Sequence, residues 1–134
     1  MPDAADRSRI AAALTRELAA RPEIVFAYLH GSFASDGPYR DVDVAVWVDP
    51  ALEPEHGTRY ALDLALALEG GLGERVDVQV LNDAPLAFRY HALAGRLLFT
   101  RDPEFLDELR TRTWDEYFDF APFALRYLRD ALGE

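Results

Sequence analysis

Three aspartates and one Gly-Ser pair are the residues of this chain whose types and spacing could do chemistry. Asp41 and Asp43 stand two positions apart, Asp77 stands alone in a later apolar segment, and Gly31-Ser32 follows an earlier one. Side chains two positions apart on a strand share a face at a separation of about 7 Å, so Asp41 and Asp43 are expected to point the same way. Two negative charges at that separation repel by about 2 kcal/mol in a protein-like dielectric. A bound cation would compensate this repulsion.

Magnesium has the chemistry that these residues require. It takes oxygen ligands, and it is usually held by one or two carboxylates together with substrate phosphates. If the segment with Asp77 forms a strand beside that of Asp41 and Asp43, three carboxylates meet, which suits a two-metal site or one metal with a neighbouring general base. The sequence therefore predicts that Asp41, Asp43 and Asp77 are catalytic and bind metal.

The Gly-Ser pair fits the binding of the phosphate on which such a metal site would act. A glycine at a turn between a strand and a helix lets backbone N–H groups approach a phosphate closely. A short helix that begins near Ser32 would point its positive end at the same phosphate. Gly31 and Ser32 are therefore predicted to bind the nucleotide, in a reaction where positioning and charge neutralisation do most of the work.

The elements that must position these residues follow from hydrophobic periodicity. Apolar alternation predicts strands over 24–30, 41–48, 75–81 and 97–100. Helical spacing predicts helices over 3–20, 61–68 and 82–94, and a last one from 103 that Pro122 should break or kink. This order predicts an α/β (α+β) fold with a mixed sheet of about four strands flanked by helices.

Composition limits the class of protein. A chain of 134 residues with 50% hydrophobic residues suits a single domain over 1–134. Its 14 basic and 24 acidic residues give a net charge of -10, which disfavours direct binding of nucleic acid. The absence of cysteine excludes disulfides and thiolate metal sites. An acidic N-terminus and the lack of a membrane-length apolar run predict a cytoplasmic protein.

Several residues admit two interpretations. Glycines 70, 71 and 73 indicate a helix end rather than a phosphate loop. The three histidines lack the spacing of a zinc site, and His30 serves either the core or the nucleotide. Trp47 could stack on a base, but packing under a helix is the favoured interpretation. In the helical region 103–134, a possible partner interface, six aromatic residues lie within the fourteen positions 114–127 and belong either to the core or to that interface: Trp114, Tyr117, Phe118, Phe120, Phe123 and Tyr127.

The segment from Gly31 to Val46 resembles the Gly-Ser-x(n)-Asp-x-Asp signature of the DNA polymerase beta-like nucleotidyltransferase superfamily, particularly its minimal nucleotidyltransferase (MNT) branch. The segment from Arg75 to Val80 stands where that superfamily carries its third carboxylate. The resemblance extends over essentially the whole chain, including the stretch from Tyr117 to Pro122. It implies a nucleotidyltransferase fold, Mg²⁺ as cofactor and ATP as substrate.

Many members of that branch resemble the antitoxin of a toxin–antitoxin pair whose toxin is a helical HEPN ribonuclease. Such antitoxins transfer AMP from ATP to a tyrosine of the toxin. The resemblance therefore implies a protein adenylyltransferase in a hetero-oligomer with a cognate HEPN toxin, with no membrane partner. Two alternatives stay open: a non-catalytic antitoxin that only masks its toxin, and a small-molecule nucleotidyltransferase, which usually needs a further domain for its acceptor.

Overall fold

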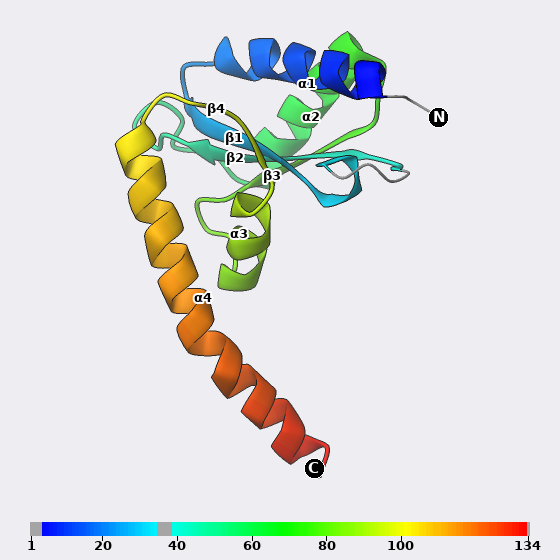
Figure 1. Ribbon diagram of the computed structural model, residues 1–134. Helices are drawn as coiled ribbons and strands as arrows, with labels where there is room; N and C mark the ends of the chain where they lie inside the picture. The colour runs from blue at the N-terminus through cyan, green and yellow to red at the C-terminus, as the bar shows by residue number, and fades with distance from the viewer. Residues whose placement is uncertain (1–3, 35–38, 134) are drawn as a thin grey trace.

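The computed structural model describes residues 4–34 and 39–133 (Figure 1). Its strands are β1 (Ile24–His30), β2 (Val42–Val48), β3 (Val76–Val80) and β4 (Arg96–Thr100). Its helices are α1 (Ala4–Ala19), α2 (Thr58–Leu72), α3 (Leu86–Leu93), α4 (Pro103–Ala131) and the short 3-10 helix η1 (Gly31–Ala34). In the described part of the chain, no helix combines the length and apolar character that crossing a membrane requires.

The four strands form one mixed sheet in the order β3-β2-β1-β4. Strand β1 runs antiparallel to both β2 and β4, whereas β2 and β3 are parallel. The predicted class, a mixed sheet of four strands with flanking helices, is confirmed. The predicted strands over 24–30, 41–48, 75–81 and 97–100 agree with the observed ones to within one residue at each end.

Helices cover both faces of the sheet (Figure 1). The valines of β2 at 42, 44, 46 and 48 are buried together with Leu14 and Leu18 of α1 and Leu64 and Leu68 of α2. The side chains on the other face of the sheet form a second cluster, in which Phe26, Tyr28 and Ala45 pack with residues of α3 and α4. Alternation within β2 therefore directs one set of side chains to α1 and α2 and the other to α3 and α4.

Trp47 lies on the α4 side of the sheet. Its ring stacks on Phe26 with centroids 6.2 Å apart and meets the ring of Phe105 of α4 at 5.2 Å. The interpretation that Trp47 fills space under a helix is confirmed, since Phe26 belongs to the core cluster on that face and Phe105 packs against it.

Helix α2 ends on a left-handed glycine, as expected, but later than the sequence indicated. Gly73 has a φ of 71°, and its N–H donates to the carbonyl of Glu69 at 2.9 Å. Gly70 and Gly71, which were expected to close the helix, lie inside it. The positive φ that this helix cap requires costs glycine little, so Gly73 suits the cap position.

The sequence predicts a break or a kink at Pro122; helix α4 continues past this residue, so the break is wrong. A proline removes a single backbone donor, and the turns on either side keep their own hydrogen bonds. Figure 1 shows that the far half of α4 extends away from the sheet. Trp114 and Tyr117 are half-buried, and Tyr117 stacks on Tyr90 of α3 at 3.8 Å. The other four terminal aromatics, Phe118, Phe120, Phe123 and Tyr127, are exposed by 55%, 55%, 67% and 73%.

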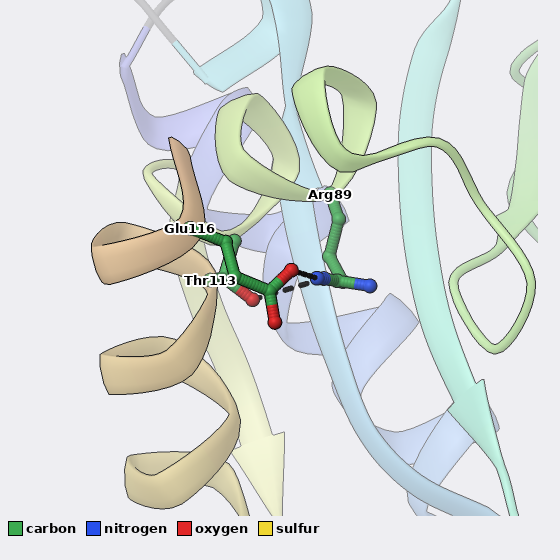
Figure 2. Close-up of polar contacts among 3 residues, drawn as sticks. All are labelled: Arg89, Thr113 and Glu116. Atoms are coloured by element: carbon green, nitrogen blue, oxygen red, sulfur yellow. Dashed lines mark hydrogen bonds and ion pairs between the residues drawn. The ribbon is translucent and has the colours of Figure 1, made fainter. Parts of the chain in front are cut away.

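A polar cluster fastens α3 to α4 (Figure 2). Nε of Arg89 donates to the hydroxyl of Thr113 at 2.9 Å, and Nη2 donates to Oε2 of Glu116 at 3.2 Å. Thr113 is fully buried. This hydroxyl is therefore the acceptor that allows the Arg89 guanidinium to lie between the helices.

Thr113→Val is expected to lower the free energy of unfolding by about 1–2 kcal/mol, because it keeps the side-chain shape but leaves Nε of Arg89 without its acceptor. Urea denaturation measures the change. Thr111→Val, at an exposed position of the same helix, is the control and should leave stability nearly unchanged. Equal stabilities of the two variants would contradict a structural role for this bond.

Candidate functional site

Three polar side chains form a row across the sheet. His30 at the end of β1 lies directly opposite Asp43 of β2, and Asp43 lies directly opposite Asp77 of β3. Residues opposite one another on neighbouring strands share a face, at about 5 Å between the strands. Asp77 therefore joins Asp43 on the face covered by α3 and α4, which is the condition that the sequence interpretation required.

Asp41 directly precedes β2, and Arg75 directly precedes β3. These two residues lie beside each other and form the next pair along the same face. Nε of Arg75 lies 3.6 Å from Oδ1 of Asp41, and the N–H of Val42 donates to the carbonyl of Arg75 at 2.8 Å. Both side chains are substantially exposed, so the ion pair is weak and readily exchanged for another partner of Asp41. Sequence reasoning missed Arg75, although its spacing of two from Asp77 placed it on the same face.

Within residues 4–34 and 39–133, no group of three or more histidine, cysteine, aspartate or glutamate side chains is close enough to hold a metal ion as it stands. The three carboxylates thus share one face without forming a preassembled three-ligand cage. The facing pair Asp43 and Asp77 still fits magnesium, because this ion usually takes one or two carboxylates and completes its shell with water and phosphate. The metal role of Asp41, Asp43 and Asp77 together stays a prediction.

Gly31 brings the backbone against Asp43. Its φ of 72° lies in the left-handed region, and a Cβ atom placed on it would overlap Oδ2 of Asp43. Only glycine permits both features at this turn. The turn runs directly into η1, which begins at Gly31 and includes the backbone of Ser32. The Ser32 side chain and the segment 35–38 of the signature lie outside the described residues, so nucleotide binding by Gly31 and Ser32 stays a prediction.

His30 is half-buried in the acidic row. Its Nε2 atom is buried and has no hydrogen-bond partner within the described structure, and its ring meets Phe88 edge-on at 5.5 Å. Burial lowers the pKa of His30 from its usual 6.5, against the opposing effect of the Asp43 and Asp77 charges. The Nε2 of this imidazole is thus a polar atom on the acidic face whose hydrogen-bonding capacity is not satisfied within the described structure.

Asp43 carries an energetic cost in the folded state. Burial raises the pKa of its carboxyl, the charges of Asp77 and Asp41 raise it further, and His30 lowers it. A raised folded-state pKa adds stability that is present below the unfolded pKa of about 4 and is lost as pH rises through the folded pKa. At neutral pH the ionised carboxylate is thus held in a site that favours its neutral form.

Asp43→Asn is therefore expected to stabilise the metal-free protein at pH 7. Allowing for solvent screening, the gain is about 1 kcal/mol, or about 2–4 °C in Tm. Thermal melts in EDTA at pH 7 and pH 4 measure it, and the gain should shrink at the lower pH. Asp119→Asn, at an exposed position of α4, should change Tm little at either pH. An unchanged or lower Tm of the Asp43 variant at pH 7 would contradict this account.

Comparisons with known proteins identify the family and support the fold. Residues 13–104 match the family model described as "Polymerase beta, Nucleotidyltransferase". The chain is similar, at 20% identity and a TM-score of 0.71, to a chain in the structure of a tri-AMPylated HEPN toxin of Shewanella oneidensis in complex with an MNT antitoxin. The match covers 94% of this chain and 98% of that one.

A second similar structure is that of a toxin–antitoxin with AMP-PNP. Its identity to this chain is 19% and its TM-score is 0.71, with 94% of this chain and 98% of that chain covered. No curated protein sequence matches the chain significantly. At these identities the solved structures establish the fold, and the family match covers most of the chain independently of them.

Proposed function

The chain belongs to the polymerase beta nucleotidyltransferase family, and from that premise we propose that it transfers AMP from ATP to a tyrosine hydroxyl of a HEPN ribonuclease toxin, which it thereby neutralises. The observation that carries this proposal is the register of β2 and β3, which sets Asp77 opposite Asp43. Gly31 lies against the same Asp43 carboxylate. A nucleotide and an acceptor can thus meet at one pair of acids.

Each residue has a role in this mechanism. Asp41 and Asp43 hold Mg²⁺, with Asp77 as a further ligand or as the base. The ion, when bound, neutralises charge on the triphosphate. Gly31 and Ser32 hold the phosphates through backbone N–H groups at the start of η1. His30 of the same row is proposed as a further contact of the nucleotide.

The transfer step is a displacement at the α-phosphorus. The phenol oxygen of tyrosine forms a bond to that phosphorus, and the bond to the oxygen bridging to the β-phosphorus breaks, so pyrophosphate leaves. The phenol proton passes to the carboxylate of Asp77. Gln79 keeps that carboxylate oriented, since its Nε2 donates to Oδ2 of Asp77 at 3.1 Å. Gln79 is a positioning residue that sequence reasoning did not single out.

The partner part of the proposal draws support from the similar structures. Both contain toxin–antitoxin complexes, one with a tri-AMPylated toxin and one with AMP-PNP. A hetero-oligomer with the toxin, in the cytoplasm and without direct nucleic-acid binding, suits the net charge of -10. The exposed aromatics of α4 are proposed as part of the toxin interface, because aromatic residues are enriched in interface cores.

A non-catalytic antitoxin that masks its toxin is the second candidate. It is favoured by one observation, the lack of a preassembled metal cage among the described residues. The two candidates differ in whether the toxin acquires AMP.

Incubation of the protein with Mg²⁺, ATP labelled at the α-phosphate and the candidate toxin tests the proposal. We expect label on the toxin, none in EDTA, and none when the acceptor tyrosine of the toxin is replaced by phenylalanine. Absence of transfer with Mg²⁺, Mn²⁺ or any other divalent cation, together with continued neutralisation, would establish the masking candidate instead.

A further inference from the structure

The first turn of α1 contacts the turn that follows β1. Nη1 of Arg7 donates to the carbonyl oxygen of Phe33 in η1 at 2.8 Å, over a separation of 26 residues in the chain. Hydrogen bonds from a charged donor are stronger than those between neutral groups. The Phe33 side chain is buried in the core cluster that α1 and α2 share with the sheet. Arg7 thus fastens α1 to η1, the element that begins at Gly31.

The same guanidinium also lies over two aromatic rings. Cζ of Arg7 is 5.3 Å from the centre of the Phe33 ring and 4.9 Å from the centre of the Tyr39 ring. Both distances are within the range of about 6 Å over which an aromatic face attracts a cation. The two rings meet edge to face with their centroids 4.6 Å apart. Arg7, Phe33 and Tyr39 therefore form one cluster, which we name the Arg7 clamp.

The Arg7 clamp joins the two halves of the candidate site. Phe33 stands two residues after Gly31, and Tyr39 stands two residues before Asp41. The contact between the rings thus ties the Gly31 turn to the start of the strand that carries the acids. Gly31 lies so close to Asp43 that a Cβ atom would overlap its carboxylate, so a movement of η1 changes the distance between the turn and the acids.

A fixed distance between the turn and the acids matters for nucleotide affinity. The turn and the acids would hold one triphosphate together, so only molecules with both halves in register bind it. When such a state is a fraction of the population, the apparent affinity falls by that fraction. Bound nucleotide restores the arrangement, so the rate of the saturated complex changes little. Loss of the Arg7 clamp should therefore raise KM for ATP rather than lower kcat.

We propose that Arg7 is a positioning residue for the nucleotide, which sets the Gly31 turn against the acids of β2 through Phe33 and Tyr39. This proposal rests on the proposed nucleotide-binding role of the Gly31 turn. It adds a residue that precedes the match to the family model, which begins at residue 13.

Steady-state kinetics of AMP transfer test the proposal, at a temperature well below the Tm of each variant. Arg7→Ala should raise KM for ATP about 10-fold, as it would if about one molecule in ten kept the turn in register. KM for the toxin and kcat should stay within about twofold of the wild-type values. A purely structural defect would act differently, because a lower fraction of folded protein reduces the apparent kcat and leaves KM unchanged.

The matched control is Arg9→Ala. Arg9 belongs to the same turn of α1, but its side chain is 76% exposed and pairs with Asp6 at 3.1 Å. This variant should keep the wild-type KM for ATP. If Arg7→Ala also keeps it, or loses only kcat, the proposal is overturned while the proposed AMP transfer stands.

Tyr39→Leu is a second variant, and it serves also if Arg7→Ala folds poorly. It removes one ring of the Arg7 clamp and retains the hydrogen bond between Arg7 and Phe33. It should likewise raise KM for ATP, and Arg7→Ala/Tyr39→Leu should raise KM no further than the stronger single variant, since residues in one cluster act non-additively. Effects on KM that multiply in the double variant would show independent roles and overturn the proposal.

NMR tests the Arg7 clamp if the wild-type protein transfers AMP to no toxin, which would be the failure of the proposed function. In the ¹⁵N-labelled, nucleotide-free chain, Arg7→Ala should shift the backbone amides of Gly31 and Asp43, whereas Arg9→Ala should leave both in place. Unshifted amides in the Arg7 variant would overturn the proposal.

Discussion

Alanine at both Asp41 and Asp43 is expected to reduce AMP transfer by at least about 1000-fold, because the loss of a single preorganised charge-stabilising group already costs about 10²–10³ in rate. Asp43 faces Asp77 and Gly31, and Asp41 is the nearest further acid on that face. Single-turnover transfer of labelled AMP to the toxin, at saturating Mg²⁺, measures the loss. Activity above about one tenth of the wild-type value would refute the assignment of the two acids.

The fold of this variant should remain intact. Because folding raises the pKa of the Asp43 carboxyl, the charged form destabilises the fold, and its removal should leave Tm equal or higher. The control removes two exposed acids from α4, with Glu104→Ala/Glu108→Ala, and should retain full activity. The same double variant separates the two candidate functions: if Asp41→Ala/Asp43→Ala still protects cells from the toxin, neutralisation occurs by masking.

Gly31→Ala is the second substitution with a large expected effect. A methyl group at this position overlaps Oδ2 of Asp43, and the φ of 72° is unfavourable for any residue with a Cβ atom. Either the carboxylate or the turn must shift, and a misplacement of about 1 Å at a reacting centre can cost about 100-fold in rate. We therefore expect at least this loss of kcat, with about 1–2 kcal/mol of stability lost to backbone strain.

Gly73→Ala is the matched control for this substitution. Gly73 has nearly the same φ, 71°, but a Cβ atom there meets nothing within 4 Å. It should lose about 1 kcal/mol of stability through the same strain and keep full activity. Equal activity losses in the two alanine variants would show that Gly31 matters only for folding.

The carboxylates of this site lower the stability of the metal-free fold. Asp43→Asn should stabilise the metal-free protein, yet Asp41→Ala/Asp43→Ala should abolish transfer. Acids that repel one another are retained where a cation and a triphosphate can relieve the repulsion. In the described structure Arg75 partly supplies that relief at Asp41, through the weak ion pair at 3.6 Å.

Periodicity in the sequence determined the secondary elements and the orientation of neighbouring side chains within them. The valines of β2 predicted a buried strand, and alternation alone set Asp41 and Asp43 on one face. These properties are local, because side chains on a strand alternate whatever its neighbours are. Helix ends were less well determined: Gly70 lies inside α2, and α4 continues through Pro122 although its far half extends away from the sheet.

Only the tertiary structure decided which side chains face one another. Alternation in β3 would be the same beside any strand, so the sequence left open that Asp77 lies opposite Asp43 and that His30 lies on the other side of it. The approach of Gly31 to Asp43, the Arg75–Asp41 pair and the place of β3 at the end of the sheet were equally hidden. Strand order and register depend on contacts between residues far apart in the chain. The periodicity of a single segment does not encode these contacts.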